Sequence, residues 1–462
     1  MKGVMSMLKI VLTGGPCSGK TVMSNLLIQL LEARGYKIFT VLEAASMLIL
    51  NGVKPSKNIS MEEFQNYILD AQLANEELFL NATKHYDSDK VIVFYDRGIM
   101  DSCAYVDKDR VFKKMLEEKG LTFSDVFNRY DAVLHLVTAA DGAEEYYQWN
   151  DPTKEEVGNN AARSESPSEA REKDKKTLNA WIGHPHLRVF DNSTNFEEKT
   201  KKVIDEVFAL LGEPSPSEIE RKFLIKRPTI EEIEKLGCVS KTNIIQTYLT
   251  RDENTAERRI RQRGTKEDGF SFFYTEKTDV SSGVRIEKEQ RITPEKYLQL
   301  MTEADTSLHQ ISKTRYCFVY EKQYFEMDIY PFSDEYAILE IELNKIDDEI
   351  VLPPLNIVVE VTDDECFRNY SLAKTLSFNV FDTEEKANNK TEEPEWVYET
   401  GRDEPEILGS GSHTYNVVKT KDEAEAFKLS KECARNYISR YRKVNGEKVY
   451  QWYDPYSKTW ID

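Results

Sequence analysis

The first candidate site is a stretch near the N-terminus that follows the phosphate-binding pattern G-x-x-x-x-G-K-[ST]. Glycines in such a loop let successive backbone N–H groups turn toward phosphate oxygens. Lys20 would reach the terminal phosphates of a nucleotide, and Thr21 would hold Mg²⁺. A chance glycine-rich turn is the alternative, but an apolar strand (8–13) and an amphipathic helix (20–34) are expected on either side, as the pattern requires. The loop residues are Gly14, Gly15, Pro16, Cys17, Ser18, Gly19, Lys20 and Thr21.

A second set of candidate residues lies in the middle of the chain, where charged residues recur at every other position. Residues two apart share one face of a β-strand. One such strand would normally face solvent, but six in succession predict a sheet that curls into a barrel with a polar interior. Acids in that interior suit divalent cations and bases suit phosphate oxygens. The charged strand faces include Glu218, Glu220 and Lys222, then Arg259 and Arg261, Lys313 and Arg315, and Glu340 and Glu342.

The phosphate loop must be positioned by a parallel sheet. Apolar strands are expected at 37–42, 91–95, 132–137 and 187–190, and a long amphipathic helix at 61–82. This alternation predicts an α/β fold with helices on both faces of the sheet, and ligands bind at the carboxyl ends of such strands.

Three further charged residues are expected at this edge of the sheet. Asp96 suits a Mg²⁺ partner or a base on a substrate hydroxyl, and Arg97 could neutralise phosphate charge. The alternative is that the two residues pair and simply close the strand end. Glu43 is either an acid of the site or a helix-start residue.

A mobile lid is predicted between residues 141 and 181, with a capped helix starting at Ser166. Its basic residues could close over bound phosphates, and Arg163 and Arg171 are the preferred pair. Solvated surface charge is the alternative for each of them.

Two resemblances to known families rest on these residues. The loop, Asp96-Arg97-Gly98 and the run 177–192 resemble the NadR-like P-loop ATPase/kinase family, which implies nucleotide binding, with kinase chemistry in some members. No N-K-x-D guanine-reading pattern occurs, so the nucleotide stays open between GTP and ATP.

The E-x-E-x-K run 218–222 and the later charged strands resemble the CYTH, or triphosphate tunnel metalloenzyme, family. Members of that family hydrolyse triphosphates or make cyclic AMP. The resemblance implies that four acids bind metal: Glu218, Glu220, Glu340 and Glu342. It implies that five bases contact phosphates: Lys222, Arg259, Arg261, Lys313 and Arg315.

Length and composition set the organisation of the chain. Its 462 residues predict two or three domains, and its net charge of −19 disfavours nucleic-acid binding. The expected domains are a P-loop nucleotide-binding domain (1–212), a CYTH-like antiparallel tunnel domain (216–361) and a C-terminal part (362–462). That part would comprise a helix at 363–373, an acidic linker at 382–403 and an aromatic-rich extension with a helix at 421–440. No signal peptide or membrane span is expected, which favours a cytoplasmic protein with, at most, peripheral membrane contact.

The order of the two domains resembles the TRPL translocation defect protein family. That resemblance implies GTP binding, phosphoinositide binding and a role in trafficking of membrane proteins. Two hypotheses follow: a nucleotide-binding regulator, which is favoured, or a bifunctional enzyme with small-molecule kinase and metal-dependent triphosphatase activities. The sequence sets no oligomeric state.

Overall fold

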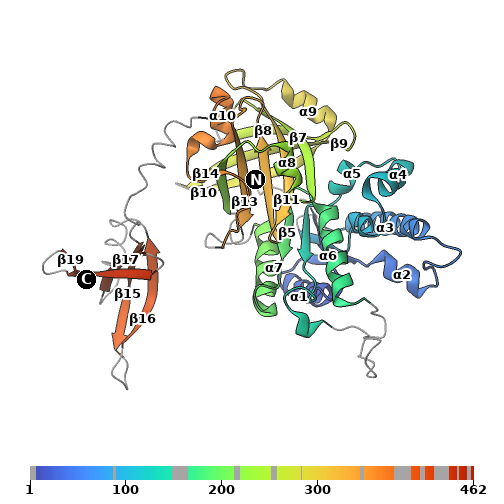
Figure 1. Cartoon of the computed structure of the whole chain (residues 1–462), viewed down its shortest axis with the longest axis horizontal. Helices are drawn as coiled ribbons and strands as arrows, with labels where there is room; N and C mark the ends of the chain where they lie inside the picture. The colour runs from blue at the N-terminus through green and yellow to red at the C-terminus, as the bar shows by residue number, and fades with distance from the viewer. Residues whose placement is uncertain are drawn as a thin grey trace. The chain divides into compact units, whose positions relative to one another are not determined.

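The chain divides into two compact units, Met1–Asn379 and Val380–Asp462 (Figure 1). The computed structural model describes residues 7–86, 90–147, 165–212, 219–250, 257–281, 284–343 and 348–378 of the first unit, and five strands between 397 and 461 in the second. In these residues, no helix combines the length and apolar character that crossing a bilayer demands.

The first sheet is parallel throughout, as predicted, and has the strand order β2-β3-β1-β4-β5. All five strands are short, and the three central ones are mostly buried, so apolar residues dominate them. Its strands are β1 (Leu8–Thr13), β2 (Lys37–Val41), β3 (Val91–Asp96), β4 (Ala132–Leu136) and β5 (Leu187–Phe190). The central position of β1 places the phosphate loop at the middle of the carboxyl edge.

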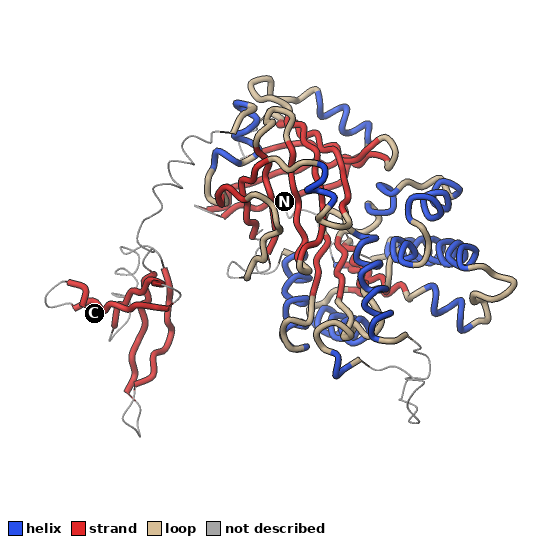
Figure 2. The backbone as a smooth tube through the Cα atoms, in the orientation of Figure 1, coloured by secondary structure: helices blue, strands red, loops and turns tan. Residues whose placement is uncertain are grey.

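Helices cover both faces of this sheet (Figure 2). On one face, α1 (Lys20–Ala33) and α7 (Phe196–Leu210) pack against the strands through Leu27 and Val203. On the other face lie α3 (Met61–Thr83) and α6 (Pro167–Trp181), together with the shorter α4 (Lys113–Glu118) and α5 (Phe123–Phe127). The short α2 (Ala44–Leu50) follows β2.

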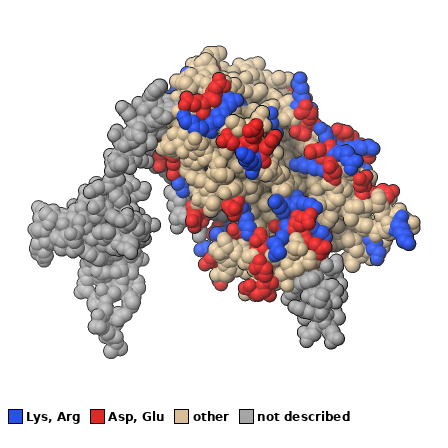
Figure 3. Space-filling model, viewed as in Figure 1, with Lys and Arg blue, Asp and Glu red and all other residues tan. Residues whose placement is uncertain are grey.

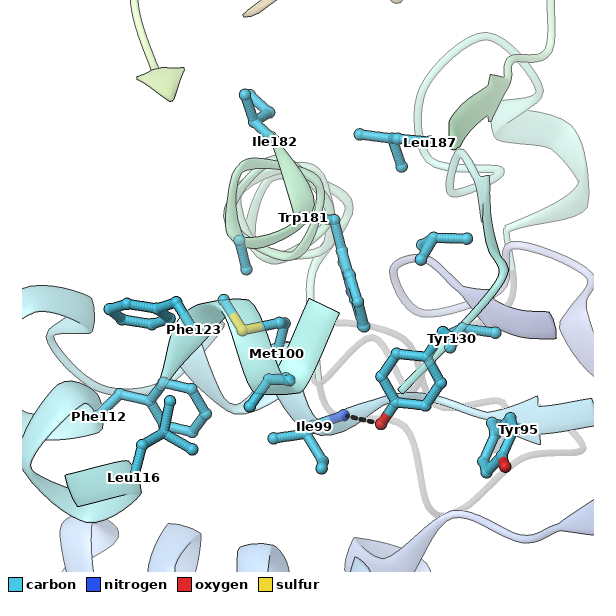
Figure 4. Packing of buried hydrophobic residues seen from close by; sticks show 14 of the residues in the cluster. Tyr95, Ile99, Met100, Phe112, Leu116, Phe123, Tyr130, Trp181, Ile182 and Leu187 are labelled. Atoms are coloured by element: carbon cyan, nitrogen blue, oxygen red, sulfur yellow. Dashed lines mark hydrogen bonds between the residues drawn. The ribbon is translucent and has the colours of Figure 1, made fainter. Parts of the chain in front are cut away.

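Helix α6 begins and ends at well-defined points. Ser166 caps it in a capping box with Glu169, which confirms the predicted start. At its end, the fully buried Trp181 lies beside Tyr130, whose hydroxyl accepts a hydrogen bond from the Ile99 N–H at 3.0 Å (Figure 4). The indole N–H of Trp181 donates to Asp101 at 3.0 Å. These contacts fix the position of α6 against the sheet.

The second sheet is antiparallel and has the strand order β10-β9-β8-β7-β11-β12-β13-β6-β14. Its strands are β6 (Ile219–Lys226), β7 (Val239–Tyr248), β8 (Glu257–Thr265), β9 (Gly269–Ser281), β10 (Val284–Ile292), β11 (Ile311–Tyr320), β12 (Gln323–Ile329), β13 (Tyr336–Leu343) and β14 (Ile357–Glu360). Alternate residues are apolar and pack outward against α8 (Ile230–Glu234) and α9 (Pro294–Met301). The charged alternates face inward, so the predicted tunnel-like fold is confirmed. A 3-10 turn (Glu365–Phe367) and α10 (Asn369–Thr375) follow.

The two sheets of the first unit meet along a continuous interface. The Ser124 N–H donates to Asp268 O at 2.9 Å, and the Gly183 N–H donates to the Tyr324 hydroxyl at 3.3 Å. Cys317 of β11 is fully buried in the same apolar cluster as Trp181. The P-loop domain and the tunnel domain therefore share part of one core.

The second unit is a five-stranded antiparallel sheet of order β16-β15-β17-β18-β19. Its strands are β15 (Val397–Pro405), β16 (Ser412–Thr420), β17 (Asn436–Val444), β18 (Glu447–Asp454) and β19 (Thr459–Ile461). Two predictions are wrong here: β15 occupies the end of the expected acidic linker, and β17 occupies the end of the expected helix 421–440. In both places, residues with high strand propensity such as Val397, Tyr398 and Ile438 pair across the sheet and outweigh the local charge and helical spacing. The rest of that expected helix, 421–435, lies outside the described residues.

Gly183 provides a direct test of the interface. Its φ of 105° favours glycine, and a Cβ atom there would lie 2.4 Å from Ser240 Oγ across the junction. Gly52 has a φ of 93°, but a Cβ atom there would meet nothing within 4 Å. Because both substitutions strain the backbone and only one creates a clash, Gly183→Ala should cost about 1–3 kcal/mol more than Gly52→Ala. Urea unfolding of both variants measures this, and equal losses would contradict the close contact.

Candidate functional site

The phosphate loop has the backbone that its sequence predicts. Gly14 has a φ of 136°, and a Cβ atom there would lie 2.0 Å from Leu136 O, so only glycine fits. Gly19 has a φ of 88° and caps α1, while Cys17 also adopts a positive φ of 55°. The loop therefore turns tightly between β1 and the N-terminus of α1, an arrangement that directs N–H groups toward an anion.

Lys20 folds back over the loop. Its Nζ donates to Gly14 O at 2.9 Å, Gly15 O at 3.1 Å and Ser18 Oγ at 3.1 Å. Burial and the nearby Arg97 lower the pKa of Lys20 to about 8. Thr21, the expected Mg²⁺ ligand, is exposed at the start of α1. Both residues stand at the start of α1, directly after the loop, and their roles toward a nucleotide and Mg²⁺ stay predictions.

Asp96, Arg97 and Glu43 gather beside Lys20, so the structure brings together the charged residues expected at this edge. Arg97 Nε donates to Glu43 Oε1 at 2.5 Å, and Arg97 Nη1 is buried without a hydrogen-bond partner in the described part of the chain. Burial would raise the pKa of Glu43, but Arg97 and the Ser46 hydroxyl hold it below its usual range. Burial raises the pKa of Asp96.

Arg97 also adopts an unusual backbone conformation, with a φ of 69°. Left-handed backbone at a non-glycine residue costs energy and persists where the surroundings enforce it. Here the Arg97 N–H donates to Leu12 O at 3.1 Å, which holds the turn against β1. The strained turn keeps the guanidinium close to Lys20.

The expected lid is anchored to the loop by an acid that the sequence did not single out. The Gly15 N–H donates to Asp174 Oδ1 of α6 at 2.5 Å, and His135 Nε2 lies 3.3 Å from the same oxygen. Burial would raise the pKa of Asp174, but His135 and the Gly15 N–H hold it low. Arg171 donates to Ala140 O at 2.6 Å and is exposed. Arg163 lies outside the described residues.

The tunnel domain encloses a cavity of about 950 Å³. Residues of the P-loop domain, including Tyr130 and His184, line one part of it, and residues of α10, including Lys374, line another. Basic side chains that line the cavity are Lys222, Arg259, Arg261, Arg263, Arg291, Lys313, Arg315, Arg368 and Lys374. The five phosphate-contacting residues expected from the sequence are thus brought together around one cavity.

Most of these bases are paired with acids. Lys222 Nζ lies 2.6 Å from Glu340 Oε1 and 2.7 Å from Glu220 Oε2. Arg261 Nη2 makes two contacts with Glu289, at 2.7 and 2.8 Å, and Arg259 lies 3.5 Å from Glu257. An anion that enters the tunnel must therefore compete with carboxylates for these bases.

Asp328 is the centre of a buried group of charges. Arg315 donates to Asp328 through Nε at 2.7 Å and through Nη2 at 2.6 Å. Nη2 also donates to Glu340 at 2.7 Å, and Arg315 pairs with Glu326. Lys313 forms an ion pair with the same aspartate. Burial lowers the pKa of Lys313. Asp328 thus fixes two expected phosphate-contacting residues.

Three of the four expected metal ligands, Glu220, Glu340 and Glu342, line the tunnel cavity. Glu220 and Glu340 both contact Lys222, whereas Glu342 pairs with Arg188 of β5. Glu218 lies outside the described residues. Within those that are described, no group of three His, Cys, Asp or Glu side chains is placed to hold a metal ion. The metal assignments stay predictions.

Three residues of these sites were missed by sequence reasoning: Asp174, Arg263 and Arg291. Arg263 continues the two-residue spacing of Arg259 and Arg261, so the sequence pattern could have identified it as a residue on the same strand face. Asp174 carries no comparable signal, because its contact with the loop spans 159 residues. On the face shown in Figure 3, acidic and basic side chains are interspersed, so the net negative charge is not gathered in one patch there.

The fold and the loop define an α/β P-loop NTPase-like domain joined to a nine-stranded antiparallel tunnel domain. Residues 9–199 match a family model described as AAA domain. Two solved structures are similar to this chain, the inorganic triphosphatase NE1496 and the hypothetical protein NE1496. Each is 28% identical over 34% of this chain, with 95% and 99% of the other chain covered and a TM-score of 0.26. A comparison with curated proteins gives no match.

Glu220 supplies a pH-dependent test of the tunnel. Burial and the nearby Glu340 raise the pKa of Glu220 to about 7. A carboxyl group with a raised pKa contributes stability that is full below its unfolded value of 4.5 and is lost as pH rises through about 7. Between about pH 5 and pH 8, the free energy of unfolding should therefore fall less steeply with pH in Glu220→Gln than in wild type.

Urea unfolding at several pH values checks this slope. The exposed Glu231→Gln on α8 is the matched control and should follow the wild-type slope. Parallel curves for Glu220→Gln and wild type would show that Glu220 titrates normally.

Proposed function

We propose that this protein is a nucleotide-binding regulator in which the state of the P-loop site alters phosphate binding in the tunnel. Helix α6 and the two residues that follow it carry the proposal, because together they contact both sites. Asp174 holds the Gly15 N–H of the phosphate loop, while Gly183, two residues after the end of α6, accepts a hydrogen bond from Arg263 of the tunnel at 2.7 Å.

A second set of contacts also connects the P-loop strand β1 to helix α6. Asp101 accepts from the Trp181 indole at 3.0 Å and from the hydroxyl of Thr13, the last residue of β1, at 2.5 Å. Trp181 is fully buried, so a shift of α6 repacks its surroundings. A ligand that moves the loop or β1 would bias the packing of α6, and α6 would bias the tunnel.

The proposed ligands follow from the chemistry of each site. The P-loop site would bind a purine nucleotide, GTP or ATP, with Mg²⁺ on Thr21. The tunnel would bind phosphorylated ligands through Lys222, Arg259, Arg261, Lys313 and Arg315, with a divalent cation on the neighbouring glutamates. Phosphoinositides as those ligands, and a role in trafficking of membrane proteins, rest on the family resemblance. The proposed domains are those expected from the sequence, 1–212, 216–361 and 362–462.

Lys20→Ala tests the nucleotide site. Loss of the ammonium group removes charge-assisted contacts to the terminal phosphates, so the affinity for GTP and ATP in Mg²⁺ should fall by at least about 100-fold. Fluorescent nucleotide analogues measure the change. The exposed Lys57→Ala is the control and should bind as wild type does. Wild-type affinity in Lys20→Ala would refute the assignment of the site.

A second candidate function is a bifunctional enzyme, and the strained Arg97 favours it. A buried guanidinium nitrogen without a partner in the described residues, beside Lys20 and Asp96, suits a group that stabilises a transferring phosphoryl. In that function Asp96 would act as base and Arg97 as charge stabiliser, while the tunnel would hydrolyse triphosphates with metal.

Turnover distinguishes the two functions. As a regulator, the protein should release no phosphate beyond a slow background from GTP, ATP or tripolyphosphate in Mg²⁺ or Mn²⁺, although it binds them. Phosphate release that disappears in Asp96→Asn or in Glu220→Gln/Glu340→Gln would establish the enzyme instead. Malachite-green detection over hours measures both outcomes.

A further inference from the structure

Two arginines at the junction end of the tunnel differ from most other bases of the cavity. Arg263 is only 7% exposed and lines both the tunnel and a smaller cavity of about 220 Å³ between the two domains. Arg291 lies on the neighbouring part of the sheet: Arg263 is opposite Ser271 of β9, and Arg291 is opposite Phe273, two residues further on.

Neither arginine forms an ion pair with a carboxylate of the described residues; each instead donates to a backbone carbonyl of the P-loop domain. Arg263 Nη2 donates to Gly183 O at 2.7 Å, and Arg291 Nη1 donates to Asn128 O at 3.3 Å. A guanidinium group has five N–H donors, so a single carbonyl leaves most of its capacity for other acceptors.

This difference decides where an anion binds most favourably. At Arg261 or Arg315, a phosphate oxygen must displace a carboxylate that is already bonded to the guanidinium. At Arg263 it forms a charge-assisted hydrogen bond without that competition, in a buried site where such bonds are strong. The carbonyl oxygens orient both arginines without neutralising them.

We propose that Arg263 and Arg291 form an anion subsite at the junction end of the tunnel, which binds a terminal phosphate group of the tunnel ligand. The group is a phosphoanhydride or a phosphomonoester, and the inference rests on the proposed phosphate binding by the tunnel. Because Gly183 and Asn128 belong to the P-loop domain, the subsite is complete only where the two domains meet.

The test is isothermal titration of the full chain with two probes, tripolyphosphate and inositol 1,4,5-trisphosphate. Arg263→Gln should weaken binding of at least one probe by about 10- to 100-fold, since it removes a charge-assisted bond in a buried site. Weaker binding of tripolyphosphate would identify the ligand group as a phosphoanhydride, and weaker binding of inositol 1,4,5-trisphosphate would identify it as a phosphomonoester of a headgroup. Arg291→Gln should weaken the same probe less, because Arg291 is exposed and therefore also tolerates substitution without risk to folding.

Arg258→Gln is the matched control on the same strand. Arg258 points to the opposite face of β8, where it pairs with Glu303 at 2.9 Å, so its variant should bind within about twofold of wild type. Wild-type affinity for both probes in Arg263→Gln and Arg291→Gln would overturn the subsite while the tunnel function stands. If wild type binds neither probe, the proposed tunnel function fails, and the subsite fails with it.

Discussion

The hydrogen bond from the Gly15 N–H to Asp174 ties helix α6 to the phosphate loop, and the arrangement of the first unit depends on that tie. No residue with a side chain fits at position 15, because a Cβ atom on Gly15 would lie 2.7 Å from Asp174 Cβ. From this point α6 runs to Trp181, which is buried in a cluster that both domains share. The residues that follow then touch the tunnel. A single helix is therefore held at the phosphate loop, and the residues that follow it line the tunnel cavity.

The tunnel itself is held by compensated charge. Asp328 is fully buried and bonded to both Lys313 and Arg315, and removal of such a partner leaves a buried cation uncompensated. The same ion pairs limit how an anionic ligand can bind. A phosphate group must displace the carboxylates from the basic side chains, or it must bind together with a cation or proton that neutralises those carboxylates. Burial and the nearby Glu340 raise the pKa of Glu220 to about 7, so a proton can neutralise this acid near physiological pH. At Arg263, an anion displaces no carboxylate of the described residues.

Much of the first unit could be predicted because local signals agree with the fold. The strand at 187–190 and the helix start at Ser166 fall at the predicted residues, where apolar runs and capping chemistry are unambiguous. The C-terminal sheet was harder, since the charged stretch before Asp403 reads as a linker until its partner strands are known. The tunnel bases could be found from their two-residue spacing. Their partners could not, because the contact from Arg263 to Gly183 spans 80 residues and exists only after the two domains dock.

One thermodynamic cycle tests whether the proposed nucleotide site and the proposed phosphate site of the tunnel are linked. The affinity of the full chain for tripolyphosphate is measured by isothermal titration with the P-loop site empty and then saturated with the nucleotide that binds it, in Mg²⁺. If the sites are linked, the tripolyphosphate Kd changes by about fivefold or more, and tripolyphosphate changes the nucleotide Kd by the same factor. Tight binding of both ligands with affinities that do not depend on each other would contradict the linkage.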